Sequence, residues 1–193
     1  MLGWLELGYI GIFVFTFLLN MLPFSSPSNL VLAAFISTNI TEINPFVVGL
    51  IVASGSTLAK LIHYYLSFYG AKVLDSDTWT RLENYGSRVG GLGAIILFLA
   101  AASPVPDDPI IVALGVVRYH PLKFLAIFLS GKILIATSGS LMGNALNPVF
   151  TSIFGDYETT VISIILTILV TVLLIKIDLK KIVERIRHKI LGV

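Results

Sequence analysis

The chain has 193 residues, of which 56% are apolar and 12% are charged, and its formal net charge is +2. A soluble domain has about a quarter charged residues, so the composition predicts an integral membrane protein with a single membrane domain. The small net charge argues against a nucleic-acid partner, and the absence of cysteine excludes disulfides, thiol nucleophiles and thiolate metal sites. The three histidines are widely spaced, so we predict no metal site and no cofactor.

The first half opens with an apolar segment over residues 1–20 that lacks a basic leader, and it is predicted to be a retained first span. The next apolar segment, residues 22–36, is shorter than the roughly 20 residues that a helix needs to cross a bilayer. Proline interrupts this segment twice. It is therefore predicted to be a re-entrant hairpin, with a break formed by Pro23, Ser25, Ser26 and Pro27.

A polar loop over residues 37–44 follows the first hairpin, and Pro45 suits the first turn of a helix that crosses the membrane and ends near Phe68. Residues 22–70 therefore form one predicted unit. Residues 72–88 mix acidic with basic side chains and carry two aromatic residues, which is typical of a segment lying at the membrane interface.

The second half repeats this pattern. Residues 89–102 are apolar and too short to span comfortably, and a second proline break precedes the apolar run 110–117. The break over 103–117 is predicted to be a second re-entrant unit, and its prolines are Pro104, Pro106 and Pro109. Residues 121–143 are predicted to cross, which completes a second unit over residues 89–143.

The end of the chain is predicted to contain a polar loop over residues 144–158, a last span over 159–176 and a basic amphipathic helix over 178–193 on the membrane surface. The lysines and arginines of this tail predict a cytoplasmic C-terminus, and counting back through the spans also places the N-terminus in the cytoplasm. The chain is therefore predicted to be a multi-pass protein of a plasma or inner membrane.

The order of the segments predicts an all-α membrane protein, with spanning helices and two opposed re-entrant hairpins. Ser54-Gly55 and Ser130-Gly131 follow a proline at the same spacing, which indicates two related halves. The first hairpin is expected to dip in from outside and the second from the cytoplasm, so the repeat is inverted. Paired proline breaks of this kind point to a transport site near the membrane midplane.

Four charged residues lie inside apolar segments: Lys60, Asp107, Asp108 and Lys132. Each would cost about 2.5–3.5 kcal/mol if it faced lipid unpaired. Two charges of each sign suggest mutual neutralisation. The two lysines, at comparable places in the two halves, are predicted to flank the acidic break. His63 lies three positions after Lys60 and hence on the same helix face.

These residues allow a structural and a functional interpretation. In the structural one, the charges form ion pairs that only hold helices together, or Asp107 and Asp108 cap a half-helix that starts near Pro109. In the functional one, the backbone groups freed by proline line a water-filled cavity, and the two lysines attract an anion such as a phosphate. One aspartate then couples transport to protons. His63 is either a proton relay or a hydrogen-bonded structural residue.

Several short patterns occur in order: the first proline hairpin from Leu22 to Phe35, then Tyr64-Tyr65-Leu66, Tyr69-Gly70-Ala71-Lys72, Gly115-Val116-Val117-Arg118-Tyr119 and Ser130-Gly131-Lys132. In these residues the chain resembles the DedA family, also called the VTT or SNARE-associated domain family, from about residue 20 to residue 145. The resemblance implies two re-entrant hairpins that face each other. It also implies that the protein moves lipids between leaflets. These lipids are polyprenyl phosphate carriers in bacteria and phospholipids in eukaryotic relatives.

The chain departs from the family pattern at its charges. Lys60 stands where the family has an acidic residue, and Asp107-Asp108 occupies the second hairpin, where the family carries arginines around the proline. The first hairpin lacks the family's glutamate, in whose place stand Ser25, Ser26, Ser28 and Asn29. The exchanged signs preserve an ion pair between helix and hairpin, but a phosphate site would then depend on Lys60 and Lys132.

Three functions are compatible with this sequence. The first is a flippase or scramblase that moves an anionic lipid or a polyprenyl phosphate. The second is a proton- or ion-coupled transporter of a small solute with Asp107 and Asp108 as coupling carboxylates, and the third is a non-transporting membrane scaffold. An enzyme is not expected, since no Ser/His/Asp arrangement and no metal-binding histidine pattern occurs. Membrane lipids are the predicted partners, and the sequence is also compatible with proton binding and with a homo-oligomer.

Overall fold

The computed structural model describes residues 8–23, 27–40, 43–71, 90–104 and 106–155, together with residues 161, 162, 165, 168 and 169. Within these residues the regular structure is helical and contains no strand. The predicted interfacial segment 72–88, the basic tail 178–193 and most of the last span 159–176 lie outside the described residues.

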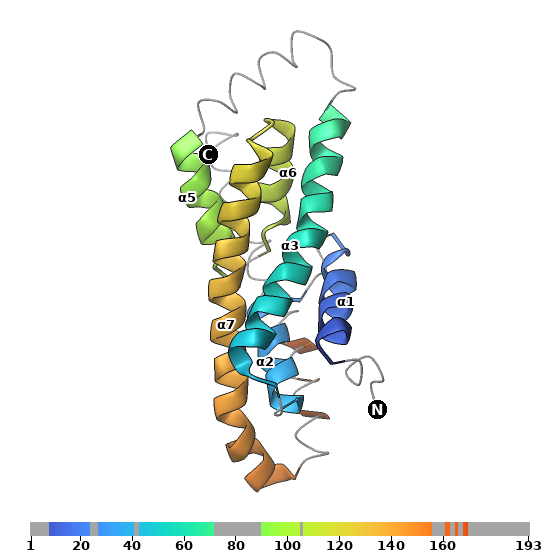
Figure 1. The fold of residues 1–193 in the computed structure, drawn as a ribbon, viewed down its shortest axis with the longest axis vertical. Helices are drawn as coiled ribbons and strands as arrows, with labels where there is room; N and C mark the ends of the chain where they lie inside the picture. The colour runs from blue at the N-terminus through green and yellow to red at the C-terminus, as the bar shows by residue number, and fades with distance from the viewer. Residues whose placement is uncertain are drawn as a thin grey trace, which may run out of the picture.

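Two long helices cross the whole structure side by side, α3 (Pro45–Gly70) and α7 (Pro121–Phe154) (Figure 1). Both are long and apolar enough to cross a membrane. They run antiparallel, since Gly49 near the start of α3 lies against Thr137 far along α7, whereas Tyr64 stacks on Phe124 near the start of α7. The predicted span after Pro45 is therefore present, and it ends two residues later than the sequence suggests.

Local sequence explains where these helices begin. Pro45 occupies the first turn of α3, and the side chain of Asn44 accepts a hydrogen bond from the Phe46 backbone N–H at 2.9 Å. Pro121 likewise opens α7. Proline suits this position because its fixed φ is helical and its missing N–H would have no partner there. Both crossing helices thus start at a proline that the sequence predicts.

Four shorter helices pack against this pair, and none of them is long enough to cross a bilayer. They are α1 (Gly8–Asn20), α2 (Asn29–Asn39), α5 (Gly90–Ala101) and α6 (Asp108–Val116). Figure 1 shows α1 and α2 beside the half of α3 that contains Pro45, α6 beside its other half, and α5 beside α7 at that same end. We call residues 21–28, between α1 and α2, the first tip, and residues 102–107, between α5 and α6, the second tip.

Glycines on the long helices and on α6 bring the helix backbones close together. A Cβ at Gly139 or Gly143 of α7 would overlap the carbonyl oxygens of Leu30 and Ala34 in α2. Gly55 of α3 meets α1, Gly131 of α7 meets α5, and Gly115 of α6 meets α3 in the same way. Close approach of this kind is how small residues support packing between membrane helices, where lipid leaves little hydrophobic drive to associate.

Two apolar cores fill the opposite ends of the structure. One gathers around α1 and α2 and includes Ile12, Leu32, Ile36, Val48 and Val52. The other gathers around α5 and α6 and includes Tyr64, Leu97, Ile111, Phe124 and Phe128. Along α3 the first core ends at Ala53 and the second begins at Tyr64. The stretch between them is where the structure places its buried charges.

The turn between α6 and α7 is tied to the second core. The Tyr64 hydroxyl donates to the carbonyl oxygen of Tyr119, and the guanidinium of Arg118 lies 4.7 Å from the centre of the Phe68 ring. Burial raises the pKa of the Tyr119 phenol above its usual value, so this side chain stays neutral in the physiological range. These contacts fix the end of α6 against α3.

The first helix pair differs from the sequence prediction. The first tip lies between α1 and α2 in the chain, and α2 is one continuous helix from Asn29 to Asn39. A hairpin contained within residues 22–36 is therefore wrong. In the described residues α1 covers only about 20 Å, too little to cross alone, and residues 1–7 of the predicted first span lie outside the description.

Two predicted polar loops are partly helical. Residues 37–39 belong to α2 because their side chains bond to nearby helices: Ser37 Oγ lies 2.5 Å from Ser140 Oγ, and Thr38 Oγ1 donates to the Ala34 carbonyl at 2.9 Å. Residues 144–154, predicted as loop, complete α7. Asn147 Nδ2 donates to the Thr38 carbonyl at 2.5 Å, so this side chain holds α7 to α2 instead of facing water.

Candidate functional site

Five ionisable side chains meet between the two apolar cores, and we call them the charged layer: Lys60, His63, Asp107, Asp108 and Lys132. Each is no more than 9% exposed. They come from α3, from the start of α6 and from α7, which are distant in sequence. All five were singled out in the sequence, and the structure brings them together.

The two aspartates lie where the second tip enters α6. Asp107 is the residue before the helix and Asp108 is its first residue, with Pro109 in the first turn. Asp107 makes no side-chain cap to the backbone. Negative charge is favourable at this end of a helix because the helix dipole is positive there. The carboxylates nevertheless point to lysines on other helices, so the capping interpretation does not describe Asp107.

Each long helix contributes one lysine to this tip. Lys60 Nζ of α3 donates to Asp108 Oδ1 at 2.7 Å, and Lys132 Nζ of α7 lies 2.5 Å from Asp107 Oδ2. The Lys132 ammonium also lies 5.1 Å from the centre of the Phe128 ring, a favourable cation–π distance. The second tip is thus held from both sides, as expected from the balance of charges in the sequence.

The two lysines lie at comparable but not identical places in the two halves, 15 residues after Pro45 and 11 residues after Pro121. Lys60 lies five residues after Gly55, whereas Lys132 lies one residue after Gly131. When the two Ser-Gly pairs are matched, Ser56 corresponds to Lys132 and Ala136 corresponds to Lys60. In this register the lysines do not repeat between the halves, and both form ion pairs with the second tip.

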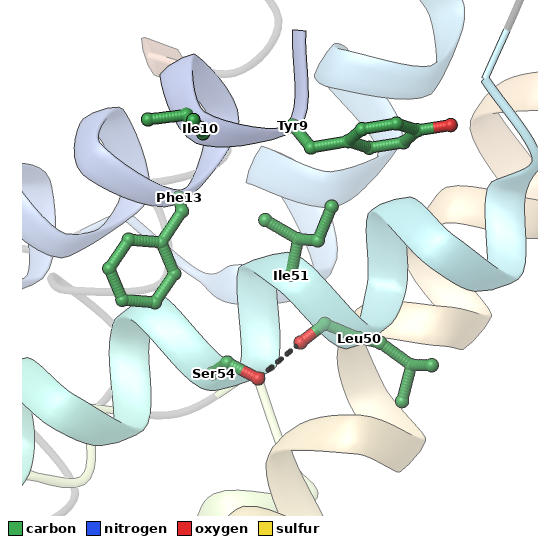
Figure 2. Close-up of a pocket in the computed structure, with 6 residues that line it drawn as sticks. All are labelled: Tyr9, Ile10, Phe13, Leu50, Ile51 and Ser54. Atoms are coloured by element: carbon green, nitrogen blue, oxygen red, sulfur yellow. Dashed lines mark hydrogen bonds between the residues drawn. The ribbon is translucent and has the colours of Figure 1, made fainter.

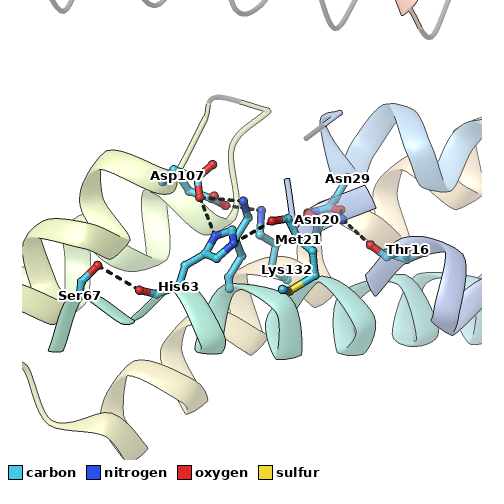
Figure 3. Close-up of polar contacts among 10 residues, drawn as sticks. Thr16, Asn20, Met21, Asn29, His63, Ser67, Asp107 and Lys132 are labelled. Carbon is cyan, nitrogen blue, oxygen red and sulfur yellow. Dashed lines mark hydrogen bonds and ion pairs between the residues drawn. The ribbon is translucent and has the colours of Figure 1, made fainter. Parts of the chain in front are cut away.

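His63 lies between the two tips (Figure 3). Its Nδ1 is 3.2 Å from Asp108 Oδ1, and its Nε2 is 3.0 Å from the carbonyl oxygen of Met21, the first residue of the first tip. A histidine three positions after Lys60 reaches the same carboxylate because both side chains leave α3 on one face. His63 therefore contacts the end of α1 and the start of α6 at once.

The first tip carries no charge among its described residues, and an asparagine lies on each side of it. Asn20 Nδ2 donates to the Thr16 carbonyl at 2.9 Å and to Asn29 Oδ1 at 3.2 Å, so it joins the end of α1 to the start of α2 (Figure 3). The hydroxyl oxygens of Thr16, Ser28 and Thr57 are buried and have no hydrogen-bond partner among the described residues. Asn20 was missed because a single asparagine at the end of an apolar segment looks like an ordinary helix end.

The prolines lie at the two tips. Pro23 and Pro27 belong to the first tip, whose Ser25 and Ser26 are outside the described residues. Pro104 and Pro106 belong to the second tip, and Pro109 lies just inside α6. Proline ends helices because it cannot donate to the ladder. Both non-helical stretches are therefore accounted for by sequence.

Asn20→Leu is expected to lower the free energy of unfolding by about 1–3 kcal/mol, because Asn29 then keeps a buried carbonyl group without its donor. The measurement is reversible unfolding of the purified protein in mixed micelles. Asn144→Leu is the matched control, since Asn144 is exposed on α7 and should tolerate leucine. Equal stability of both variants would show that Asn20 does not hold the first tip.

One pocket lies between α1 and α3 (Figure 2). It has a volume of about 340 Å³ and is lined by Tyr9, Ile10, Phe13, Leu50, Ile51 and Ser54. The Ser54 hydroxyl donates to the Leu50 carbonyl at 2.7 Å and is thus already satisfied. No charged side chain lines this pocket, so the charged layer is the better candidate for a functional site.

The charged layer contains no group of side chains suited to a metal ion. Among the described residues, no three histidine or carboxylate side chains come together in a way that would hold one. Lysine occupies the positions beside both aspartates, and it repels a cation. The chemistry available here is ion pairing and proton binding.

A sequence model described as the VTT domain matches residues 22–145. The match covers well over half of the chain, from the first tip through most of α7, and includes all five residues of the charged layer. No curated protein and no solved structure matches the chain.

Proposed function

Because the chain belongs to the VTT domain family, which is the DedA family of membrane proteins, we propose that it moves an anionic lipid between the leaflets of a membrane. The observation that carries this proposal is the charged layer. Buried ion pairs contribute little net stability compared with apolar residues of the same volume. Ionisable residues inside membrane segments therefore indicate a functional site.

The arrangement of the short helices supports an inverted repeat of two re-entrant hairpins. The pairs α1–α2 and α5–α6 lie beside opposite halves of the two crossing helices (Figure 1). In this proposal the pairs enter the membrane from opposite sides, and their tips approach each other near the midplane, where His63 contacts both. Non-helical backbone at that depth needs a polar or water-filled surrounding, which the charged layer supplies.

The lysines are the proposed contacts for the lipid headgroup. In the described arrangement Asp108 and Asp107 already neutralise Lys60 and Lys132. An anionic headgroup exchanges with one carboxylate as the partner of a lysine when the second tip moves. The ammonium is then never left unpaired in the membrane, which avoids the large cost of an isolated buried charge. The headgroup chemistry is a phosphate ester, carried by a phospholipid or by a polyprenyl phosphate.

Lipid exchange in proteoliposomes tests this function. The purified native protein is reconstituted with a trace of fluorescent phosphatidylglycerol or of labelled polyprenyl phosphate, and accessibility to an external quencher is followed. We expect exchange by the native protein. The paired variants Lys60→Met/Asp108→Asn and Lys132→Met/Asp107→Asn should fall to the rate of protein-free vesicles, because both lose a headgroup contact.

The controls separate exchange of anionic lipid from unspecific exchange, and they separate the functional from the structural interpretation of the charges. Ser130→Ala changes an exposed residue of α7 and should exchange lipid as the native protein does. An uncharged fluorescent lipid should not be moved faster than in empty vesicles. Native rates in both folded paired variants would leave the ion pairs with a structural role only, as in a membrane scaffold.

A second candidate is a proton-coupled transporter of a small solute. The contact of His63 with the Asp108 carboxylate at 3.2 Å favours it, because a histidine beside a carboxylate is an arrangement that proteins use to pass protons. Absence of exchange for every anionic lipid, together with solute uptake that a protonophore abolishes, would support this candidate over the lipid transporter.

A further inference from the structure

The ring of His63 has a hydrogen-bond acceptor on each side. Asp108 Oδ1 lies 3.2 Å from Nδ1, and the Met21 carbonyl oxygen lies 3.0 Å from Nε2. A neutral imidazole has only one N–H and can donate to only one of them. Both contacts are satisfied together only when an additional proton is present.

That proton is shared by two groups. If it is on the ring, the imidazolium donates to both acceptors. If it is on Asp108, the carboxylic acid donates to Nδ1 while Nε2–H donates to Met21. In either case Lys60 Nζ still donates to Asp108 Oδ1 at 2.7 Å. Turning the ring over would place carbon atoms at both contacts, so the observed orientation is the one that bonds. The proton therefore belongs to the His63–Asp108 pair and not to one residue.

The neighbours of this pair set its charge. Lys60 faces it from α3, and Asp107 and Lys132 form their own ion pair beside it from the start of α6 and from α7. Towards α1 the ring contacts the Met21 carbonyl. With the proton on either group of the pair, the layer has a net charge of +1. Without it, the two lysines and the two aspartates cancel to zero.

We propose that the His63–Asp108 pair is a proton-binding site that latches the two tips together. When the proton leaves, the remaining N–H stays with the Asp108 carboxylate, because hydrogen bonds to charged acceptors are about twice as strong as those to neutral ones. The Met21 carbonyl then faces a ring lone pair instead of a donor. The first tip loses this contact with α3, and the two tips separate.

The latch also couples proton binding to the binding of the lipid headgroup. This part of the inference rests on the proposed function. The protonated layer, with its net charge of +1, attracts one anionic headgroup, whereas the deprotonated layer is neutral. Proton binding and headgroup binding therefore favour each other, since two sites that neutralise one another are linked reciprocally. The latch itself requires no lipid.

Spin-label distances test the latch directly. The native chain has no cysteine, so Leu22→Cys and Leu66→Cys place one label at the first tip and one on α3. Both positions are more than half exposed, at 54% and 66%. In nanodiscs, we expect a short distance at low pH and a longer one at high pH, with a curve that fits a single proton. Distances that do not change with pH would overturn the proposal.

Two substitutions identify the histidine responsible. His63→Gln keeps a donor and an acceptor but no titrating group, so the distance should stop responding to pH. His120→Gln removes an exposed histidine before α7 and should respond as the native protein does. A response in His63→Gln equal to that of the native protein would assign the titration elsewhere and reject the latch.

Nitrogen NMR of the histidine rings keeps the proposal testable if His63→Gln does not fold. The His63 signals in the otherwise native chain are assigned by comparison with His120→Gln and His188→Gln. At low pH, we expect either both ring nitrogens protonated or a proton on Nε2 alone. A neutral ring protonated only on Nδ1 at low pH would contradict the site. Neither readout depends on transport, so failure of lipid exchange leaves this result unaffected.

Discussion

Lys60→Met is expected to lower the free energy of unfolding by about 3–5 kcal/mol, the usual cost of removing one partner of a buried ion pair. Methionine keeps most of the apolar stem of the lysine, so the packing of α3 changes little. Asp108 remains only 2% exposed and loses its ammonium partner. The measurement is unfolding of the reconstituted protein by steric trapping or by a mixed-micelle titration.

A double-mutant cycle shows whether this cost belongs to the pair. Lys60→Met/Asp108→Asn removes both charges, and most of the lost stability should return because no charge is left unpaired. The coupling energy between the two sites should then be large. If the stability costs of Lys60→Met and of Asp108→Asn simply add in the double variant, Lys60 and Asp108 do not act as a pair and the geometry of the second tip is wrong.

The same cycle separates stability from function. A paired variant that is as stable as the native protein but moves no lipid would place transport at the charged layer. A paired variant that is stable and active would make the ion pair a structural element of the second tip. The variant Lys60→Glu/Asp108→Lys adds a further comparison, because it restores the signs expected from the family pattern.

Gly139→Ala is expected to cost more than about 3 kcal/mol, above the usual range for an added methyl group in a packed core. The new Cβ would overlap the carbonyl oxygen of Leu30 and lie 2.8 Å from its carbonyl carbon. Flexible side chains can give way, but here the neighbour is the backbone of α2. The whole helix would have to move away from α7, which would also strain the Ser37–Ser140 contact at 2.5 Å.

Gly91→Ala is the matched control for this substitution. Gly91 lies in α5, and a Cβ there meets no atom within 4 Å. Alanine should leave stability unchanged or raise it by a few tenths of a kcal/mol up to about 1 kcal/mol, because glycine is the poorer helix former. Native-like stability of Gly139→Ala would show that α2 and α7 do not touch along this line.

Much of the helical framework follows from local sequence. The apolar stretch after Pro45 is long enough to cross a bilayer and forms α3, while the stretch before Pro104 is too short and forms α5. Proline ends or starts helices by removing a donor and fixing φ, so the two tips could be located without a structure. Membrane character likewise follows from composition alone.

The helix ends at polar residues were decided by tertiary contacts. Residues 37–39 and 144–154 look like loop because their side chains are polar, but Ser37, Thr38 and Asn147 bond across the α2–α7 interface. Sequence does not reveal whether such a side chain faces water or another helix.

The sequence by itself determined that this is an all-helical membrane protein with proline breaks and with four charges that need partners, since chain length, apolarity and charge cost are properties of each segment. Only the tertiary structure decided that Lys60 pairs with Asp108, that Lys132 pairs with Asp107 and that His63 reaches Met21. These pairings join residues far apart in the chain. They depend on which helix faces approach each other, and close contacts such as that of Gly139 with the Leu30 backbone set that geometry.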